Sequence, residues 1–284
     1  MVNRMPVLAA LAALSLATAP AIAQTPGTAA PIFQSTVPAL RFVPLQRLPR
    51  APAAGSKDLC SHLLTSRPET PAGRQVAEAG WGVTGEVRLG PYQAVSFVGS
   101  YESGTSGSCL LGDGNIGIFQ GSSLVAIAYA PAGGKASIAR AIAFEQDGLR
   151  IWDGDFLSQP VADIRLGENG SLTLQPLASV EKVCGGAASI PNIYGKPIDQ
   201  ARGLLQQSGW SPVTPRRSPR EPLDGRVADL TRRGVPEVED CSGTGFGFCA
   251  YGYHGPAGRL SVTTVGDNAF PTVADYAANC GAPG

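Results

Sequence analysis

The chain has 284 residues, and its 22 Lys and Arg residues balance its 22 Asp and Glu residues. This balance argues against nucleic acid or an anionic lipid surface as a general partner, because both attract an excess of basic side chains. The 36 glycines and 24 prolines are typical of a chain with many turns, so we expect a mainly β fold.

Residues 1–23 have the features of a secretory signal peptide. Arg4 supplies a positive charge, an apolar run covers Val7–Ala17, and Ala21-Ile22-Ala23 has the small-x-small pattern of a cleavage site. We therefore expect cleavage between Ala23 and Gln24 and a periplasmic or secreted protein. The apolar run is shorter than the ~20 residues of a transmembrane helix, so we expect no membrane span.

Residues 24–55 are rich in Ala and Pro, and this composition predicts a semi-extended tether. A β-rich domain is expected over residues 56–184. It begins with two short helical patterns, one around Leu59–Leu64 and one over Ala72–Ala79. The second pattern ends at Gly80-Trp81, which we interpret as a helix C-cap.

A series of strands follows, separated by Asp-Gly, Asn-Gly and Gly-Pro turn signals that favour hairpins. The expected strands are Val83–Leu89, Ala94–Tyr101, Ile116–Gln120, Leu124–Ala130, Ile138–Glu145, Leu149–Trp152, Val161–Leu166 and Ser171–Leu174. They predict an antiparallel meander that forms a sandwich or barrel. The domain boundary is expected within residues 179–188.

A small two-layer α+β domain is expected over residues 185–284. Pro197 suits the first turn of a helix, and an apolar stripe at helical spacing follows it, made of Ile198, Ala201, Leu204 and Leu205. Gly209 can end this helix in a left-handed conformation, and Trp210 can fold back onto the last turn. The later elements are expected at Trp210–Val213, Leu223–Arg233, Val235–Cys241, Phe248–His254 and Arg259–Val265, all strands except the second, which is a helix.

Residues 190–213 resemble the opening of a PASTA domain. The residues that carry the resemblance are Pro191-Asn192, Gly195-Lys196, Ala201, Leu205 and Gly209-Trp210. PASTA domains are extracytoplasmic modules of one helix on a three-stranded sheet, associated with peptidoglycan fragments and β-lactam-binding proteins. The tail, with its Cys241–Cys249 segment, is similar to small exported bacterial proteins of unknown function. The resemblance implies cell-wall material as a partner.

Six cysteines follow the expected cleavage site, and an even number in an exported chain indicates disulfides. Cys241 and Cys249 are close enough in sequence to close a hairpin. The other four allow more than one pairing, of which we expect Cys60–Cys109 within the first domain and Cys184–Cys280 around the second.

No catalytic set is recognisable in the sequence. The chain lacks a complete G-x-S-x-G motif and has only two histidines, His62 and His254. Zinc binding by His254 with Cys241, Cys249 and Cys280 has an unusual spacing and competes with oxidation of the thiols. We interpret Asp153-Gly-Asp155 as a turn. No metal, cofactor or catalytic residue is therefore expected.

Our leading hypothesis is an exported, non-catalytic cell-envelope binding protein, whose partner is cell-wall material or an envelope protein. The candidate binding surface is aromatic, and it consists of Trp210, Phe246, Phe248, Tyr251 and Tyr253. One alternative is an inhibitor or adaptor of an envelope enzyme that acts through the Cys241–Cys249 loop. Another is a hydrolase of cell-wall or sugar substrates that uses a carboxylate pair. The oligomeric state is left open.

Overall fold

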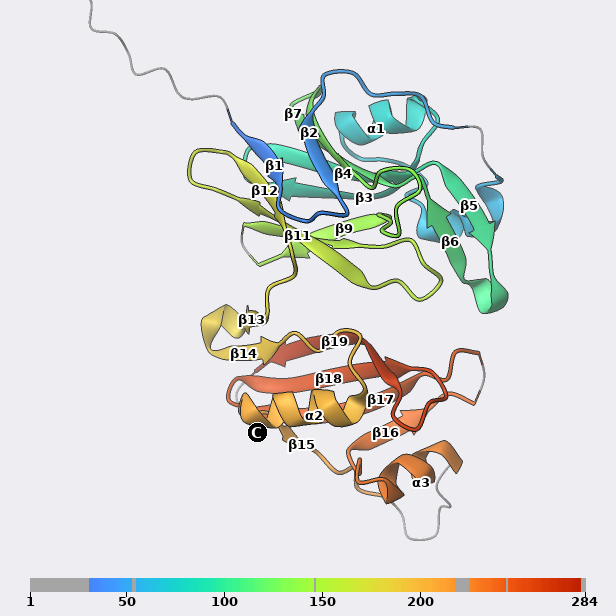
Figure 1. Ribbon diagram of the computed structural model, residues 1–284, viewed down its shortest axis with the longest axis vertical. Helices are drawn as coiled ribbons and strands as arrows, with labels where there is room; N and C mark the ends of the chain where they lie inside the picture. Colours follow the sequence, from blue (N-terminus) through green and yellow to red (C-terminus); the bar gives the residue numbers. More distant parts are fainter. Residues whose placement is uncertain (1–30, 53–54, 146, 218–224, 244, 282–284) are drawn as a thin grey trace, which may run out of the picture. The chain divides into compact units, whose positions relative to one another are not determined.

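The computed structural model describes residues 31–52, 55–145, 147–217, 225–243 and 245–281. The expected signal peptide and its cleavage site at Ala23–Gln24 lie outside the described residues. Most of the regular structure is antiparallel sheet, with a few short helices (Figure 1). This confirms the predicted class, mainly β plus α+β.

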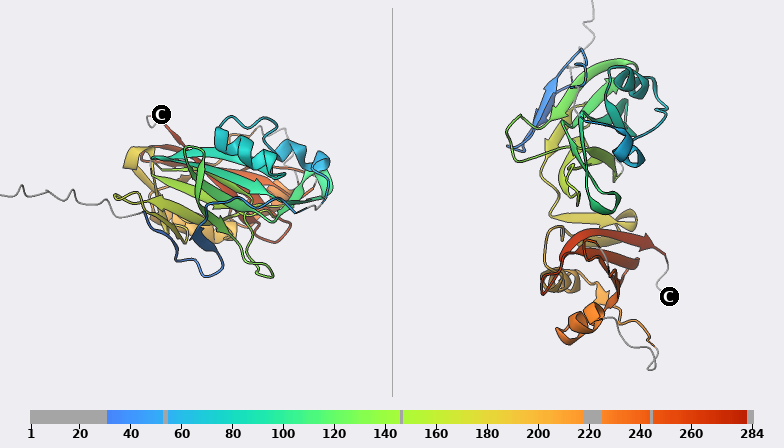
Figure 2. Two further views of the ribbon diagram at one scale, coloured as in Figure 1. Left: turned by 90° about the horizontal axis from the view of Figure 1, so that it is seen from above. Right: turned by 90° about the vertical axis from the view of Figure 1, so that its right-hand side faces the viewer.

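Two five-stranded sheets form the β-rich part, as Figures 1 and 2 show. The first has the order β2-β8-β7-β4-β3, with bounds β2 (Arg41–Pro44), β3 (Gly82–Leu89), β4 (Tyr92–Val98), β7 (Asn115–Gln120) and β8 (Ser123–Tyr129). The second has the order β1-β12-β11-β10-β9, with bounds β1 (Phe33–Ser35), β9 (Arg140–Phe144), β10 (Gly148–Trp152), β11 (Pro160–Leu166) and β12 (Leu172–Gln175). Neighbouring strands are antiparallel except β1 and β12, which are parallel.

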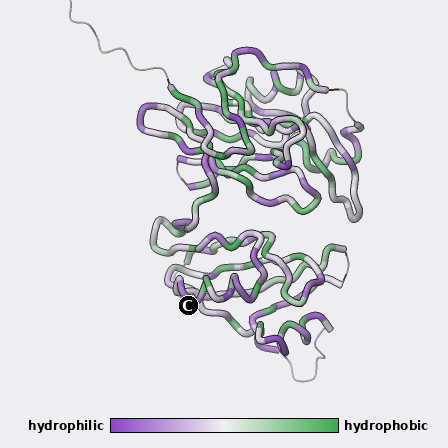
Figure 3. Tube along the Cα trace, in the orientation of Figure 1, coloured by the Kyte–Doolittle hydropathy of each residue, from purple (hydrophilic) through white to green (hydrophobic). Residues whose placement is uncertain are grey.

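The two sheets share one hydrophobic core, so this part is a sandwich. Alternate residues of each strand point inward, for example Ile116 and Ile118 of β7 and Leu149 and Ile151 of β10. Figure 3 shows hydrophobic positions interleaved with hydrophilic ones along the chain. The sheets approach each other where β3 contacts β9 and where β1 contacts β2.

The predicted tether over residues 24–55 is wrong for much of its described part. β1 and β2 both lie in this segment and pair with β12 and β8. Leu40 and Phe42 are buried in the sandwich core. Three or four residues of strand are too short to produce a visible pattern among the prolines and alanines, and only their long-range partners make them regular.

A helical layer covers the outer face of the first sheet. The helix α1 (Pro71–Glu78) begins at Thr70, whose hydroxyl accepts the Gly73 N–H at 2.9 Å. Ala72 and Val76 pack on residues of β3, β4, β7 and β8. Beside it lie the 3-10 helix η1 (Asp58–Leu63) and a hairpin of β5 (Ser100–Ser103) and β6 (Cys109–Gly112), with η2 (Thr105–Gly107) at its tip. The hairpin was not predicted.

The C-terminal part is a two-layer α+β unit. A hairpin of β13 (Val180–Val183) and β14 (Ala188–Pro191) opens it, with η3 (Cys184–Gly186) at the turn. The helices are α2 (Ile198–Gln207) and α3 (Gly225–Arg232), and the sheet consists of β15 (Ser211–Pro212), β16 (Val238–Cys241), β17 (Cys249–Gly255), β18 (Gly258–Val265) and β19 (Thr272–Cys280). The apolar stripe of α2 packs on the inward face of this sheet. The sequence analysis missed β19.

The helices end in the same way. At the end of α2 the Gly209 N–H donates to the Gln206 carbonyl at 3.1 Å, and the Trp210 N–H reaches the Leu205 carbonyl at 3.0 Å. Gly80 and Trp81 make the matching pair of bonds after α1. Gly209 and Gly80 have φ values of 86° and 95°, which glycine adopts without steric cost. The two Gly-Trp pairs therefore reflect a shared helix cap.

All six cysteines form disulfides, in the expected pairs Cys60–Cys109, Cys184–Cys280 and Cys241–Cys249. The first joins η1 to β6, and the second joins the turn after β13 to the end of β19. Three disulfides are consistent with an oxidising, non-cytoplasmic compartment. No helix in the described ranges is both long and apolar enough to cross a bilayer.

A buried ion cluster links the second sheet to the C-terminal part. Arg150 of β10 donates to both carboxylate oxygens of Asp163 at 2.9 and 3.2 Å, and it also donates to Glu181 of β13. The Tyr276 hydroxyl of β19 donates to the same Glu181 at 2.7 Å. Burial would lower the pKa of Arg150, but its bonds to the two carboxylates outweigh burial and raise that pKa. The Phe144 ring lies 3.7 Å from the guanidinium carbon.

Replacing Arg150 with Met should destabilise the protein by about 3–5 kcal/mol, because two buried carboxylates lose their counter-ion. The free energy of unfolding in urea measures this loss. Adding Asp163→Asn and Glu181→Gln to Arg150→Met should recover part of it. Arg88→Met is the control, since Arg88 is exposed and makes no ion pair with a described residue. A loss below about 1 kcal/mol for Arg150→Met would contradict the structural role of the cluster.

Candidate functional site

The predicted aromatic surface is wrong for three of its five residues. Trp210, Tyr251 and Tyr253 are 1%, 0% and 1% exposed and belong to the C-terminal core. The alternation of β17 turns both tyrosines inward, and the Trp210 indole N–H donates to the Ser189 carbonyl at 2.8 Å. The Tyr253 hydroxyl donates to the buried Glu237 at 2.9 Å. These side chains stabilise the fold and are not available to a ligand.

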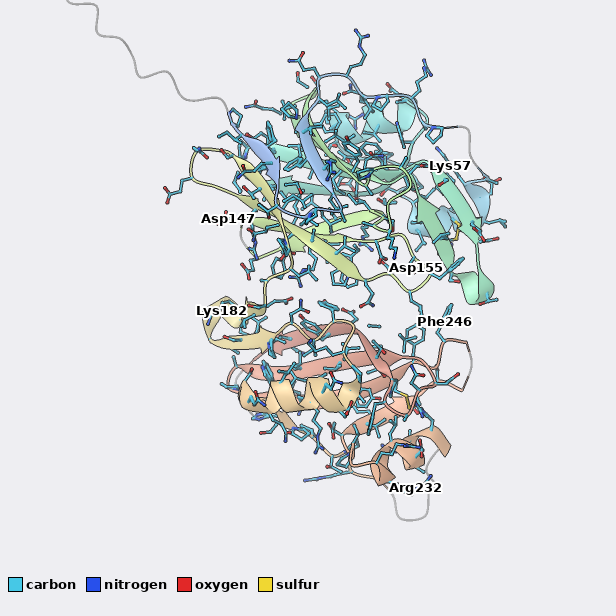
Figure 4. All side chains as sticks on the ribbon, in the orientation of Figure 1. Lys57, Asp147, Asp155, Lys182, Arg232 and Phe246 are labelled. Carbon is cyan, nitrogen blue, oxygen red and sulfur yellow. A yellow bond between two sulfur atoms is a disulfide. The ribbon has the colours of Figure 1, made fainter. Side chains whose placement is uncertain are left out.

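Phe246 and Phe248 are the accessible remainder of that surface. Both lie on the loop between β16 and β17 that the Cys241–Cys249 disulfide closes, and Figure 4 labels Phe246. Their ring centroids are 6.2 Å apart in an edge-to-face arrangement, and Phe248 is 39% exposed. With Phe156 and Leu157 they line a shallow cavity of about 360 Å³.

One face of the second sheet carries charged side chains among apolar ones. In the register of β9 and β10, Arg140 lies opposite Trp152 and Ile142 lies opposite Arg150. Residues directly opposite each other point to the same face of an antiparallel pair. The other face of these strands, with Ala141, Leu149 and Ile151, fills the sandwich core. The face with the charged side chains therefore holds the Arg150 cluster and, next to it, Arg140 and Trp152.

Arg140 and Trp152 line a cavity of about 570 Å³. Its wall combines η1 and the segment after it, residues of β3, β6, β9 and β10, the loop after β10 and one residue of β19. The charged or titratable lining residues are His62, Arg140, Asp153, Asp155 and Asp275. This volume is within the ordinary range of small-ligand sites.

Asp153 organises the loop after β10. Its Oδ1 accepts the N–H groups of Asp155 at 3.2 Å and of Gln159 at 3.0 Å. These bonds confirm the predicted turn at Asp153-Gly-Asp155. Burial raises the pKa of Asp153, against the lowering effect of these backbone bonds. A side-chain hydrogen bond from Ser158 also lowers the pKa of Asp153, so the loop holds this carboxylate through several donors.

Asp275 enters the cavity from β19, where Ala274 bulges out of the register with β18. The Asp275 Oδ1 accepts the Tyr276 N–H at 2.8 Å, and burial raises the pKa of Asp275. The neighbouring Ala274 carbonyl accepts a bond from the Gln159 amide at 3.1 Å. This bond ties the loop after β10 to the strand that carries Asp275.

Trp152 forms a fixed wall of the cavity. Its ring meets Tyr194 edge-to-face, with centroids 5.6 Å apart and planes at 86°. The indole N–H is buried and has no acceptor in the described part of the chain. An aromatic ring held in this way offers a flat surface for an apolar group or a cation.

The charged groups of the cavity form no ion pairs with one another or with other described residues. Arg140 and His62 make no ion pair or side-chain hydrogen bond with a described residue, and neither Asp153, Asp155 nor Asp275 pairs with a basic side chain. The cavity therefore offers one guanidinium and three carboxylates for hydrogen bonds to a bound molecule. Among the described residues, no three His, Cys, Asp or Glu side chains are grouped to hold a metal ion. The disulfides also remove the thiols of the considered zinc set.

This site was not predicted from the sequence. Asp153 and Asp155 were interpreted as part of a turn, and Trp152 as the end of a strand. A usable signal exists in the alternation of β9 to β11, which places Arg140, Arg150 and Asp163 at strand positions that apolar residues flank. Asp275 gives no such signal, because β19 was not predicted from the sequence. Its position beside the cavity is visible only in the folded structure.

Asp153 and Asp275 should titrate above the ordinary aspartate value of 3.8, because burial disfavours their charged forms. Between pH 3.8 and the raised pKa of each group, the folded state binds more protons than the unfolded state. Their contribution to the free energy of unfolding should therefore decrease as the pH rises through this window. Carbon-13 NMR titration of the carboxyl carbons measures both groups, with Asp153→Asn identifying one resonance. Midpoints at or below 3.8 would refute the assignment.

Comparison with protein-family models, with curated proteins and with solved structures finds no match for this chain. The PASTA resemblance of residues 190–213 therefore depends on those residues alone. What the chain can do is argued from the geometry of its cavity.

Proposed function

We propose that the protein is an exported, non-catalytic cell-envelope binding protein and that its cavity around Trp152 holds a fragment of cell-wall material, such as a peptidoglycan peptide. The observation that carries this proposal is an open cavity of about 570 Å³ whose charged side chains make no ion pairs within the described chain. Unpaired charges lose hydration when a ligand enters, and a ligand with complementary groups restores their hydrogen bonds.

Two further features support this proposal. The three disulfides suit an oxidising compartment outside the cytoplasm. The module that resembles a PASTA domain contributes Asp275 to the cavity, so the ligand would contact both parts of the protein. In this proposal the module helps to form the site, and its buried aromatic residues hold the sheet and helix together.

Purified mature protein should sediment with insoluble peptidoglycan. Thr65→Trp places a large side chain at the cavity wall without changing its charge, and it should weaken retention about tenfold or more, equivalent to ~1.4 kcal/mol. Ser261→Trp is the matched control, because Ser261 is exposed on β18 and does not line the cavity. Wild-type retention no better than that of an unrelated disulfide-bonded protein of similar charge would rule out cell-wall binding.

The hydrolase alternative is favoured by the carboxylates of the same cavity, since burial raises the pKa of Asp153 and of Asp275. A raised pKa suits a general acid. The sedimentation assay separates the two functions when soluble fragments are measured in the supernatant. A binding protein releases none, whereas a hydrolase releases fragments at a rate that Asp153→Asn or Asp275→Asn reduces at least a hundredfold.

The adaptor alternative is favoured by the exposed Phe246–Phe248 pair on the disulfide-closed loop. If this loop binds an envelope protein, Phe248→Ala should remove that partner from affinity-purified material without lowering the unfolding temperature. Leu59→Ala is the control, since Leu59 is an exposed apolar side chain on a different element. An unchanged partner list for Phe248→Ala would exclude this alternative.

A further inference from the structure

We propose that the cavity around Trp152 binds a zwitterionic α-amino-acid group, with the ligand ammonium at Asp153 and Asp275 and the ligand carboxylate at Arg140. This inference rests on the proposed function, because it names the ligand class of the same site. It follows from three features of the cavity: charges of both signs, the absence of pairing between them, and a fixed aromatic wall.

The cavity contains opposite charges that do not neutralise each other. Arg140 makes no ion pair with any described carboxylate, although Asp153, Asp155 and Asp275 line the same space. Arg150, on the same face of the sheet, pairs with two carboxylates and is buried. The positive and negative groups of the cavity are therefore held apart by the fold, which leaves room between them for a molecule that carries both charges.

Backbone N–H groups hold one oxygen of each of the two carboxylates in place. The Asp153 Oδ1 is held by the Asp155 and Gln159 N–H groups, and the Asp275 Oδ1 is held by the Tyr276 N–H. These bonds orient the carboxylates before a ligand arrives, which lowers the entropic cost of binding. A primary ammonium has three N–H donors, which suits a wall that carries several carboxylates.

Arg140 and Trp152 define the opposite side of the ligand. They are directly opposite in the β9–β10 register, so the guanidinium and the indole lie on one face of the sheet. A guanidinium binds a carboxylate through two parallel hydrogen bonds. The Trp152 ring, fixed by its contact with Tyr194, provides the apolar surface for the carbon atoms between the two charges.

Charge and size further define the ligand class. With three carboxylates and one guanidinium the lining is acidic, so a second amine on the ligand is favoured. The volume of about 570 Å³ exceeds what one small amino acid needs. A diamino acid at the end of a peptide combines a zwitterionic centre, a carbon chain and a second amine.

Calorimetry with three matched probes tests this inference on the full mature chain. The probes are meso-diaminopimelate, 1,5-diaminopentane, which lacks its carboxylates, and heptanedioate, which lacks its amines. Diaminopimelate should bind at least tenfold more tightly than either analogue, because each charge-assisted hydrogen bond contributes roughly 10- to 100-fold. Equal or tighter binding of either analogue would overturn the inference.

Two variants test which residues bind the carboxylate and the ammonium of the ligand. Arg140→Gln should weaken diaminopimelate about tenfold or more and leave 1,5-diaminopentane unchanged, whereas Asp153→Asn should weaken both. Arg259→Gln and Glu168→Gln, exposed residues outside the cavity, should change neither affinity. An Arg140→Gln protein that weakens both probes equally would contradict the proposed orientation.

The result of this calorimetry can be distinguished from the result of the sedimentation assay that tests the proposed function. If peptidoglycan is retained in a Thr65-dependent way and diaminopimelate does not bind, the zwitterion inference is wrong and the wall-binding function stands. If diaminopimelate binds with the expected variant pattern and peptidoglycan is not retained, the zwitterion site stands and wall binding is wrong.

Discussion

The charge of Arg150 is the constraint on which much of the structure depends. A guanidinium that is almost completely removed from water must be surrounded by anions and acceptors, and here Asp163, Glu181 and the Phe144 ring surround it. Glu181 belongs to β13 and is held in turn by Tyr276 of β19. The need to satisfy one arginine therefore joins three elements that are far apart in the sequence.

One face of the second sheet carries two arginines with different roles, one that stabilises the fold and one that is available to a ligand. Arg150 is paired with two carboxylates, whereas Arg140, on the neighbouring strand, lines the open cavity and has no ion-pair partner among the described residues. Because β19 is tied to β13 through Tyr276 and Glu181, Asp275 is brought to the cavity beside Trp152. The ion cluster that links β10, β13 and β19 thus also helps to complete the cavity. A change at Arg150 should disturb both the fold and the site.

The aromatic residues have two roles, and burial decides which role each ring has. Buried rings stabilise the core, and partly exposed rings can contact a ligand or partner. Trp210, Tyr251 and Tyr253 face the helices of the C-terminal unit, and burial raises the pKa of Tyr251 to about 12, although its hydrogen bond with Thr264 lowers that pKa. Trp152 keeps part of its ring open to the cavity, and Phe248 keeps part of its ring open to solvent. Aromatic content alone could not predict a binding surface, since large rings are the side chains that a small core needs most.

The sequence by itself determined those features that depend on neighbours along the chain. Strand alternation and turn residues predicted β3, β7, β8, β10 and β11 closely, and Gly209-Trp210 predicted the end of α2. The spacing of Cys241 and Cys249 predicted their disulfide, whereas the pairing of the other four cysteines was left open by the sequence and is given by the fold. Local conformational preference and chain proximity are sufficient for the strands, the helix end and the Cys241–Cys249 disulfide.

Only the tertiary structure decided which strands join a sheet without a pattern of their own and which charges remain unpaired. β1 and β2 become strands through distant partners, and the tether prediction failed for this reason. Arg140, Asp153 and Asp275 come from separate elements, and nothing in their spacing shows that they share a cavity. Whether a polar side chain is paired, buried or open depends on what packs over it, and that is a property of the folded chain.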